Sequence, residues 1–292
     1  MTSAILSTNQ EVLTSIVNDD KLPILANIPK AVGRIRKGDT SGTVFIASVQ
    51  HKGKRHPMFF SAGHIFAENG VLPSDVNFAE YKLEFGNQPP FTLQDITDMF
   101  STTTVIFFKS ASMVKERDFV LQEPNFLPYT DSFAMILHDN GDAGSAERLL
   151  RSELQLEPLQ CGDGLYLEPN PGESIIVLGY PGVGLQKSVE SLRFSIGREF
   201  GSEEITLKLE DLLRNLKSSS TYTGICQTKC DQGKNCKFCQ LTSRIDQLKS
   251  PEFRKNRIFY KNDTLPGNSG SPILSSRNNN IRHGLQCQRD PC

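Results

Sequence analysis

The chain has 292 residues, of which 37% are hydrophobic and 22% are charged, and this is the composition of an ordinary globular protein with room for a sizeable core. A formal net charge of −1 gives no electrostatic footprint for nucleic acid or an anionic surface, and no apolar run is long enough to span a bilayer. We therefore expect neither nucleic acid nor a membrane among the partners.

The first 25 residues predict a short helix that extends the chain at its N-terminus. Apolar residues recur there at helical spacing, and the sequence N-D-D at 18–20 would end the helix. The start has no basic segment and no long apolar stretch, so it does not resemble a secretory signal. We expect no chemistry in 1–25 and a cytoplasmic location, with secretion left open if a precursor segment is removed.

From residue 31 onward, short β-rich runs alternate with Gly, Pro and Asn. Many short strands between turn residues are typical of an all-β sandwich or of barrels. The runs are 31–36, 42–48, 58–61, 81–85, 103–108, 133–137, 174–178, 192–196, 257–260 and 271–274. A charged stretch that contains N-G-D, residues 139–156, indicates a link between two halves.

Residues 201–256 depart from the β pattern. Leucine and isoleucine recur at helical spacing in the first part, which predicts a helix there. These residues are Ile205, Leu209, Leu212, Leu213 and Leu216. Four cysteines and a polar stretch follow, so we interpret 201–256 as an insertion into the second half.

The strongest chemical motif is P-G-N-S-G-S-P at 266–272. A serine hydroxyl is a weak nucleophile until a base removes its proton and hydrogen-bond donors stabilise the oxyanion. Gly267 lets the backbone turn so that its own amide and the amide of Ser269 point into one small space. We predict that Ser269 is a nucleophile and that these two amides form its oxyanion hole. The alternative is a Gly/Ser-rich turn that leads into a strand.

A second motif, S-A-G-H at 61–64, ends a β-rich run. Its small residues leave room for the imidazole of His64 at a strand end, where it can take up and return a proton near neutral pH. A lone histidine is more often a hydrogen-bonded core residue. The Ser269 motif further along the chain favours His64 as the general base.

Two aspartates compete for the role of the group that orients this histidine. Asp131 stands just before the apolar run 133–137, and Asp118 stands just before F-V-L at 119–121. A carboxylate beside the base would hold its ring and stabilise its charged form. We favour Asp131 because the run that follows it is the better candidate for a buried strand. A turn-initiating role is the alternative.

Together these strings resemble the trypsin-like serine peptidases, and most closely the glutamyl-endopeptidase and bacterial-type branch. The strings are 41–46, 61–64, 131–137, 179–182 and 264–272, and they keep the family's order of His, Asp and Ser. The resemblance implies two six-stranded antiparallel β-barrels. It also implies hydrolysis of peptide bonds in a protein or peptide substrate, through an acyl-enzyme and with no cofactor for catalysis.

On this basis we expect three parts in the chain. The N-terminal extension covers 1–25, and the first barrel, with His64 and Asp131, covers 26–142. The second barrel covers 143–292, contains Ser269 and carries the helical, Cys-rich insertion at 201–256.

The family's specificity pocket has its floor six residues before the nucleophile, which is Asp263 in this sequence. A carboxylate there would favour Arg or Lys before the scissile bond. Glutamate-preferring relatives combine a threonine five residues before the serine, as Thr264 is here, with a histidine on the last strand, where Gln286 falls and His283 is out of register. We favour a preference for Arg or Lys before the scissile bond, with Glu or Gln as the alternative. Asp263 could also be an ordinary solvated turn residue with no role in specificity.

Four cysteines in the insertion have the spacing C-x₃-C-x₅-C-x₂-C; they are Cys226, Cys230, Cys236 and Cys239. Four thiolates on two tight turns can close a tetrahedron around Zn²⁺, which would be structural because no position is left for water. Two disulfides, in an exported protein, or free thiols are the alternatives.

Two other functions compete with the peptidase. A catalytically silent binding module on a protease scaffold would use the Cys-rich insertion as its partner surface, because fold does not imply function. An α/β-hydrolase esterase would need G-x-S-x-G and a histidine after the serine, and residues 267–271 lack the second glycine of that pattern.

Overall fold

The computed structural model describes residues 28–51, 54–67, 72–100, 102–108, 132–139, 145–160, 174–180, 192–218, 245, 249, 260–261, 269–275 and 281–283. In these residues the chain is mostly β, with few helices. No helix in this part of the chain is both long and apolar enough to cross a membrane. The predicted N-terminal helix lies outside the described residues.

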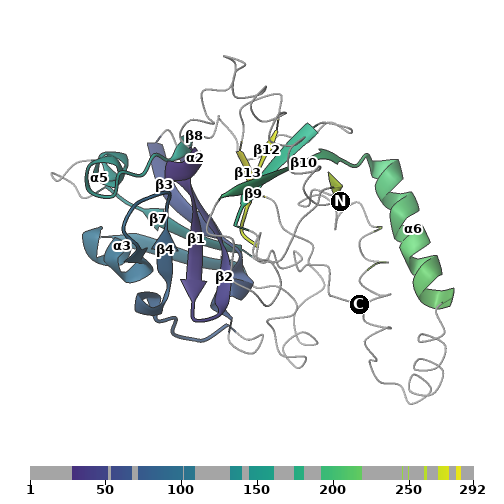
Figure 1. Cartoon of the computed structure of the whole chain (residues 1–292), viewed down its shortest axis with the longest axis horizontal. Coiled ribbons are helices and arrows are strands. Elements are labelled where there is room, and N and C mark those ends of the chain that lie inside the picture. The colour runs from purple at the N-terminus through teal and green to yellow at the C-terminus, as the bar shows by residue number, and fades with distance from the viewer. Residues whose placement is uncertain are drawn as a thin grey trace. The chain divides into compact units, whose positions relative to one another are not determined.

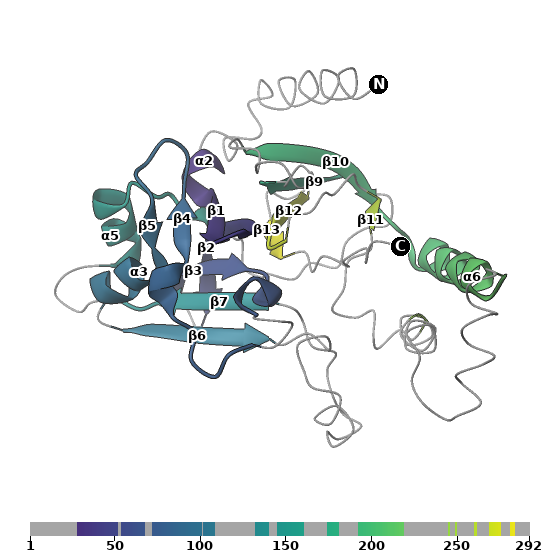
Figure 2. The same cartoon turned by 60° about the horizontal axis from the view of Figure 1, so that its bottom comes forward.

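Seven strands form one curled antiparallel sheet, in the order β5-β4-β1-β2-β3-β7-β6 (Figures 1 and 2). The strands are β1 (Val32–Lys37), β2 (Thr40–His51), β3 (Lys54–Ser61), β4 (Lys82–Glu84), β5 (Phe91–Thr92), β6 (Thr103–Phe108) and β7 (Ser132–Leu137). A two-residue strand, β8 (Leu159–Gln160), adds to β2 in parallel.

The middle of the long strand β2 is buried on both faces, which explains its unbroken apolar run V-F-I-A at 44–47. Val44 and Ile46 belong to a core enclosed by the curled sheet, whereas Phe45 and Ala47 belong to a second core on the other face. Successive side chains of a strand point to opposite faces, so β2 separates the two cores.

Phe66 shows that the sheet curls around the first core. Its ring centroid lies 4.7 Å from that of Tyr81, next to β4, and 5.2 Å from that of Phe107 on β6. β4 and β6 lie towards opposite ends of the strand order, so one side chain reaches both regions only if the sheet bends around it.

Two short helices, α3 (Leu93–Met99) and α5 (Ala146–Glu153), pack against this core. α3 begins with a capping box, in which Thr92 Oγ1 accepts a hydrogen bond from the backbone N–H of Asp95 and the Asp95 carboxylate accepts one from the N–H of Thr92. In the described part of unit 1, the other short helical elements are α2 (Ile28–Ala31), η2 (Gly63–Phe66) and η3 (Phe78–Glu80).

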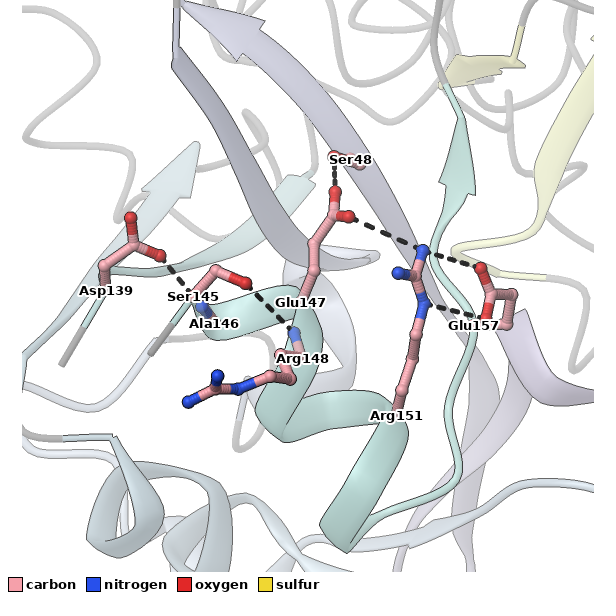
Figure 3. A network of polar contacts seen from close by, with 8 residues as sticks. All are labelled: Ser48, Asp139, Ser145, Ala146, Glu147, Arg148, Arg151 and Glu157. Carbon is pink, nitrogen blue, oxygen red and sulfur yellow. Dashed lines mark hydrogen bonds and ion pairs between the residues drawn. The ribbon is translucent and has the colours of Figure 1, made fainter. Parts of the chain in front are cut away.

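Polar contacts fix α5 to its surroundings (Figure 3). Ser145 caps the helix, and Glu147 accepts a hydrogen bond from the hydroxyl of Ser48 on β2. Arg151 donates two hydrogen bonds, of 2.9 and 2.8 Å, to the carboxylate of Glu157. This part of the predicted link at 139–156 is therefore a packed helix.

A second sheet has the order β11-β10-β9-β12-β13. Its strands are β9 (Ser174–Gly179), β10 (Arg193–Glu199), β11 (Tyr260–Lys261), β12 (Pro272–Ser275) and β13 (Ile281–His283). β9 and β12 are antiparallel, and they contribute Ile176, Leu178 and Leu274 to the core on the outer face of β2.

The chain divides into two compact units. Unit 1 consists of Met1–Glu168, Glu173–Gly197 and Asn262–Cys292, and unit 2 of Pro169–Gly172 and Arg198–Lys261. The curled sheet, β9, β12 and β13 belong to unit 1, and β10 runs from one unit into the other.

Unit 2 contains the predicted helix, α6 (Ser202–Ser218). Its buried face consists of Ile205, Leu209 and Leu213, which pack with Ile245. Leu212, one of the apolar residues at helical spacing in the sequence, is 46% exposed and lies outside this buried face. It lies about 60° around the helix from Leu209, at the edge of the apolar stripe.

The prediction of an all-β fold is confirmed in its coarser form, because the described chain is mostly β with few helices. Most of the predicted runs that are described are strands with ends shifted by a few residues. The described strands form one curled sheet of seven consecutive strands, to which β8 adds beside β2, and one five-strand sheet. Closure into two six-stranded barrels, the three-part division of the chain and the Cys-rich insertion stay predictions.

Candidate active site

His64 lies on η2, immediately after strand β3. The next two residues, Ile65 and Phe66, are 2% and 0% exposed and are part of the first core, whereas His64 itself is half-buried. The two buried side chains anchor this turn of helix in the core, while His64 keeps part of its surface accessible to solvent.

Ser269 lies in a turn that leads directly into β12. Gly270 follows it with φ +85°, a left-handed conformation that residues with a Cβ atom rarely adopt. Ser269 and Gly270 are buried. Of the buried side-chain oxygens and nitrogens in the described residues, Ser271 Oγ has no hydrogen-bond partner.

The turn at Ser269 packs closely against the residues that precede His64. A Cβ atom on Gly270 would lie 2.3 Å from the carbonyl oxygen of Thr43, 2.7 Å from Ser61 Oγ and 2.8 Å from the backbone nitrogen of Ala62. Real Cβ atoms do not come so close, so only glycine fits at position 270.

Gly42 makes a second close approach between the same segments. A Cβ atom there would lie 2.1 Å from Cδ1 of Ile65 and 3.1 Å from the carbonyl oxygen of Ser269. Ile65 follows His64 directly, so two glycines allow the His64 segment (residues 61–66) and the Ser269 segment (residues 269–274) to pack together.

Thr43 joins these segments by hydrogen bonds. Its N–H donates to the carbonyl oxygen of Ser269 at 2.8 Å, and its own carbonyl oxygen accepts from Ser61 Oγ at 2.7 Å. In the sequence, Thr43 belongs only to the β-rich run 42–48 and the family string 41–46, and nothing local predicts its contacts. We call the contact of Thr43 with the His64 and Ser269 segments the joint.

A partly buried ion pair lies beside Thr43. Arg34, directly opposite Thr43 on β1, is 6% exposed and donates from Nε to the carboxylate of Glu84 at 2.7 Å. Burial raises the pKa of the Tyr180 hydroxyl above its usual value; Arg34 opposes this increase and Glu84 adds to it. Tyr180 is therefore neutral at physiological pH.

The start of β7 is also close to the His64 segment. Phe133 pairs with Ser61, three residues before the histidine. β7 is the buried strand predicted after Asp131, and it begins at Ser132, the residue that follows this aspartate in the sequence.

The remaining candidate residues lie outside the described residues. They are Asp131 and its rival Asp118, Gly267 of the oxyanion hole, Asp263 and Thr264 of the specificity pocket, Gln286, and the four cysteines Cys226, Cys230, Cys236 and Cys239. His283 is the last residue of β13 and pairs with Pro272. Within the described part of the chain, no three His, Cys, Asp or Glu residues lie close enough together to hold a metal ion.

No protein-family model matches the sequence, and a search of curated proteins finds no relative. Among solved structures, the chain is similar to an inactive form of Rv3671c from M. tuberculosis H37Rv, a serine-to-alanine mutant. The identity is 15% and the TM-score 0.37, over 87% of this chain and 73% of that one.

A second similar structure is the scabies mite inactivated protease paralogue S-D1. The identity is 10% and the TM-score 0.42, over 90% of this chain and 83% of that one. Likenesses this weak leave the family of the chain open.

Proposed function

We propose that the protein is a serine endopeptidase of the trypsin-like type. Ser269 is the nucleophile, His64 is the general base and Asp131 orients the histidine. The backbone amides of Gly267 and Ser269 form the oxyanion hole. The substrate is a protein or peptide, and catalysis needs no cofactor.

The observation that carries the proposal is the packing of the Ser269 segment against the His64 segment. These segments are about 200 residues apart in the sequence, yet Gly270 lies against Ser61 and Ala62, and the carbonyl oxygen of Ser269 accepts a hydrogen bond from Thr43. A nucleophile and its base must come within hydrogen-bond reach of each other, and this packing supports that arrangement.

The reaction would proceed in two steps. His64 removes the proton of the Ser269 hydroxyl as Oγ attacks the peptide carbonyl carbon, and the amides hold the oxyanion. The C–N bond then breaks, and His64 gives its proton to the leaving amine. In the second step His64 removes a proton from water as the water oxygen attacks the acyl-enzyme ester. The bond from the acyl carbon to Ser269 Oγ then breaks, His64 returns its proton to Oγ, and the carboxylic acid leaves.

Asp263 and Thr264 would line the pocket for the residue before the scissile bond. A carboxylate at the pocket floor would pair with a cationic side chain, so we propose a preference for Arg or Lys, with Glu or Gln as the alternative. A peptide library with one varied position decides between these preferences.

The four cysteines of unit 2 would bind one structural Zn²⁺ through their thiolates. Protein purified under reducing conditions without a chelator should contain about one zinc ion per chain by elemental analysis. Cys236→Ser should lose that zinc. Metal-free parent protein with an unchanged helical signal in circular dichroism would contradict the proposal.

Labelling with a fluorophosphonate tests the central proposal, because this probe modifies only an activated serine. The parent should be labelled, whereas Ser269→Ala and His64→Ala should not be. Ser271→Ala is a matched control in the same motif; its Oγ has no hydrogen-bond partner, so its loss should leave labelling intact. An unlabelled, folded parent would contradict the peptidase and favour a binding module that uses the Cys-rich segment.

A further inference from the structure

Thr43 is buried, with 0% exposure, on the central strand β2. Its backbone N–H binds the Ser269 segment and its backbone carbonyl binds the His64 segment, through Ser61. Both hydrogen bonds use only main-chain atoms of Thr43, so any residue except proline could form them at this position. They do not explain why the residue is a threonine.

The Thr43 hydroxyl oxygen accepts a buried hydrogen bond of 3.0 Å from the backbone N–H of Tyr180. Tyr180 comes directly after β9. The Thr43 side chain thus ties a third segment, the end of β9, to the same residue that holds the other two.

β9 is the neighbour of β12, the strand that begins three residues after Ser269. β9 pairs with β12, and the pairing of Val177 with Ile273 and of Ile176 with Leu274 fixes the register. Continued by three residues, this register places Tyr180 opposite Gly270.

The ladder between β9 and β12 stops at Val177 and Ile273, so the N–H of Tyr180 has no ladder partner among the described pairs. A buried N–H without an acceptor is costly, and the Thr43 hydroxyl supplies the acceptor. Valine has the same shape as threonine but offers no acceptor, so it would leave this N–H unpaired.

We propose that Thr43 is a positioning residue for the Ser269–His64 pair, and that its hydroxyl fixes the end of β9 against the nucleophile turn. This inference rests on the proposed peptidase function. The turn at Gly270 has no room to shift towards Thr43, because Gly270 packs directly against the Thr43 carbonyl and Ser61 Oγ. A shift of Thr43 or Tyr180 therefore moves Ser269 relative to His64.

The test compares the kinetics of fluorophosphonate labelling in the parent, Thr43→Val and Thr43→Ser, well below their melting temperatures. A positioning role lowers the rate constant of labelling while the final labelled fraction stays complete. A merely structural role lowers the labelled fraction, because fewer molecules are folded, and leaves the rate constant of the folded molecules unchanged.

We expect Thr43→Val to react about ten-fold or more slowly and Thr43→Ser, which keeps the hydroxyl, to return to within about three-fold of the parent. Leu150→Val, on the buried face of α5, is the control for lost packing without contact with Thr43. It should be less stable than the parent and label at the parental rate.

Two results would overturn the inference. Thr43→Val that labels at the parental rate would contradict the positioning role and leave the peptidase proposal standing. A folded parent that is not labelled at all would contradict both. If Thr43→Val does not fold, Thr43→Ala, which also lacks the hydroxyl, takes its place: a labelling rate about ten-fold or more below the parental rate supports the role, and a parental rate contradicts it.

Discussion

The His64 segment and the Ser269 segment meet at one joint, but different forces hold each of them. The His64 segment is anchored by side chains, because Ile65 and Phe66 fill the aromatic core of the curled sheet. The Ser269 segment is anchored by its backbone, through the bond from Thr43 to Ser269 and the left-handed Gly270.

This difference predicts two kinds of response to mutation. A packed side chain can be shortened in steps, and the cost grows with the volume of the cavity that is left. A backbone conformation that only glycine adopts has no intermediate substitute, since every other residue adds a Cβ atom. The Ser269 segment should therefore fail abruptly and the His64 segment gradually.

Gly270→Ala should give the largest effect. Its Cβ would meet the Thr43 carbonyl at 2.3 Å, and φ of +85° would be strained even without this clash. The turn must move, and a displacement of about 1 Å at a nucleophile can cost about 100-fold in rate. We expect fluorophosphonate labelling to be at least 100-fold slower and the fold to lose more than about 3 kcal/mol.

Gly38→Ala is the matched control, because Gly38 also has a positive φ, of +55°, but nothing lies within 4 Å of its Cβ position. Only backbone strain is added, which costs about 1–2 kcal/mol. Labelling should proceed at the parental rate. Equal losses in both variants, measured by labelling and by denaturant unfolding, would mean that strain alone and not the joint limits the reaction.

Phe66→Ala should give the second largest effect. Phe66 is fully buried and its ring contacts those of Tyr81, Phe107 and Phe133. Loss of such a ring costs about 3–5 kcal/mol, and η2 loses the packing that fixes His64. Phe66→Leu should lie between Phe66→Ala and the parent, both in unfolding free energy and in labelling rate.

Leu209→Ala is the control for a cavity away from the joint. It removes a buried side chain from the small α6 cluster in unit 2 and should cost about 2 kcal/mol without slowing the reaction. If Phe66→Leu and Phe66→Ala are equally slow, the His64 segment does not respond gradually, and the contrast between the segments is lost.

The sequence predicted the strands well where β-branched and apolar residues form an unbroken run. The run 103–108 has the bounds of β6, and 133–137 differs from β7 by one residue. It missed α3, although T-x-x-D at 92–95 is a capping signal, because seven residues give too few turns for a clear helical period. It missed α5 because its polar residues favour a linker, and the contacts with β2 are not local.

The same limit applies to the candidate site. The motifs around His64 and Ser269 are local, so they could be found in the sequence. The role of Thr43 depends on partners at Ser61, Tyr180 and Ser269, and no local pattern specifies which distant residue a hydroxyl or an amide will meet. The Gly270 requirement could be suspected from the motif, but its closeness to Thr43 could not.

Glu80→Gln should give the smallest effect, at the outer edge of the packing around Phe66. Glu80 forms a 2.7 Å ion pair with Lys37, and Lys37 Nζ lies 5.2 Å from the ring centroid of Tyr81, which packs on Phe66. The hydrogen bond and the positive charge of Lys37 hold the pKa of the Glu80 carboxyl below its ordinary value.

Because this pKa is lower in the folded protein, the pair stabilises the fold above the ordinary carboxyl pKa. This stabilisation is lost as the pH falls through the lowered value. Both side chains are accessible to solvent, so at neutral pH Glu80→Gln should lower the melting temperature by no more than about 2 °C. The difference should vanish in acid and shrink in high salt, and labelling should be unchanged. A large loss of labelling would instead mean that the side-chain anchor of His64 extends to the surface, and the two segments would then differ less than their cores suggest.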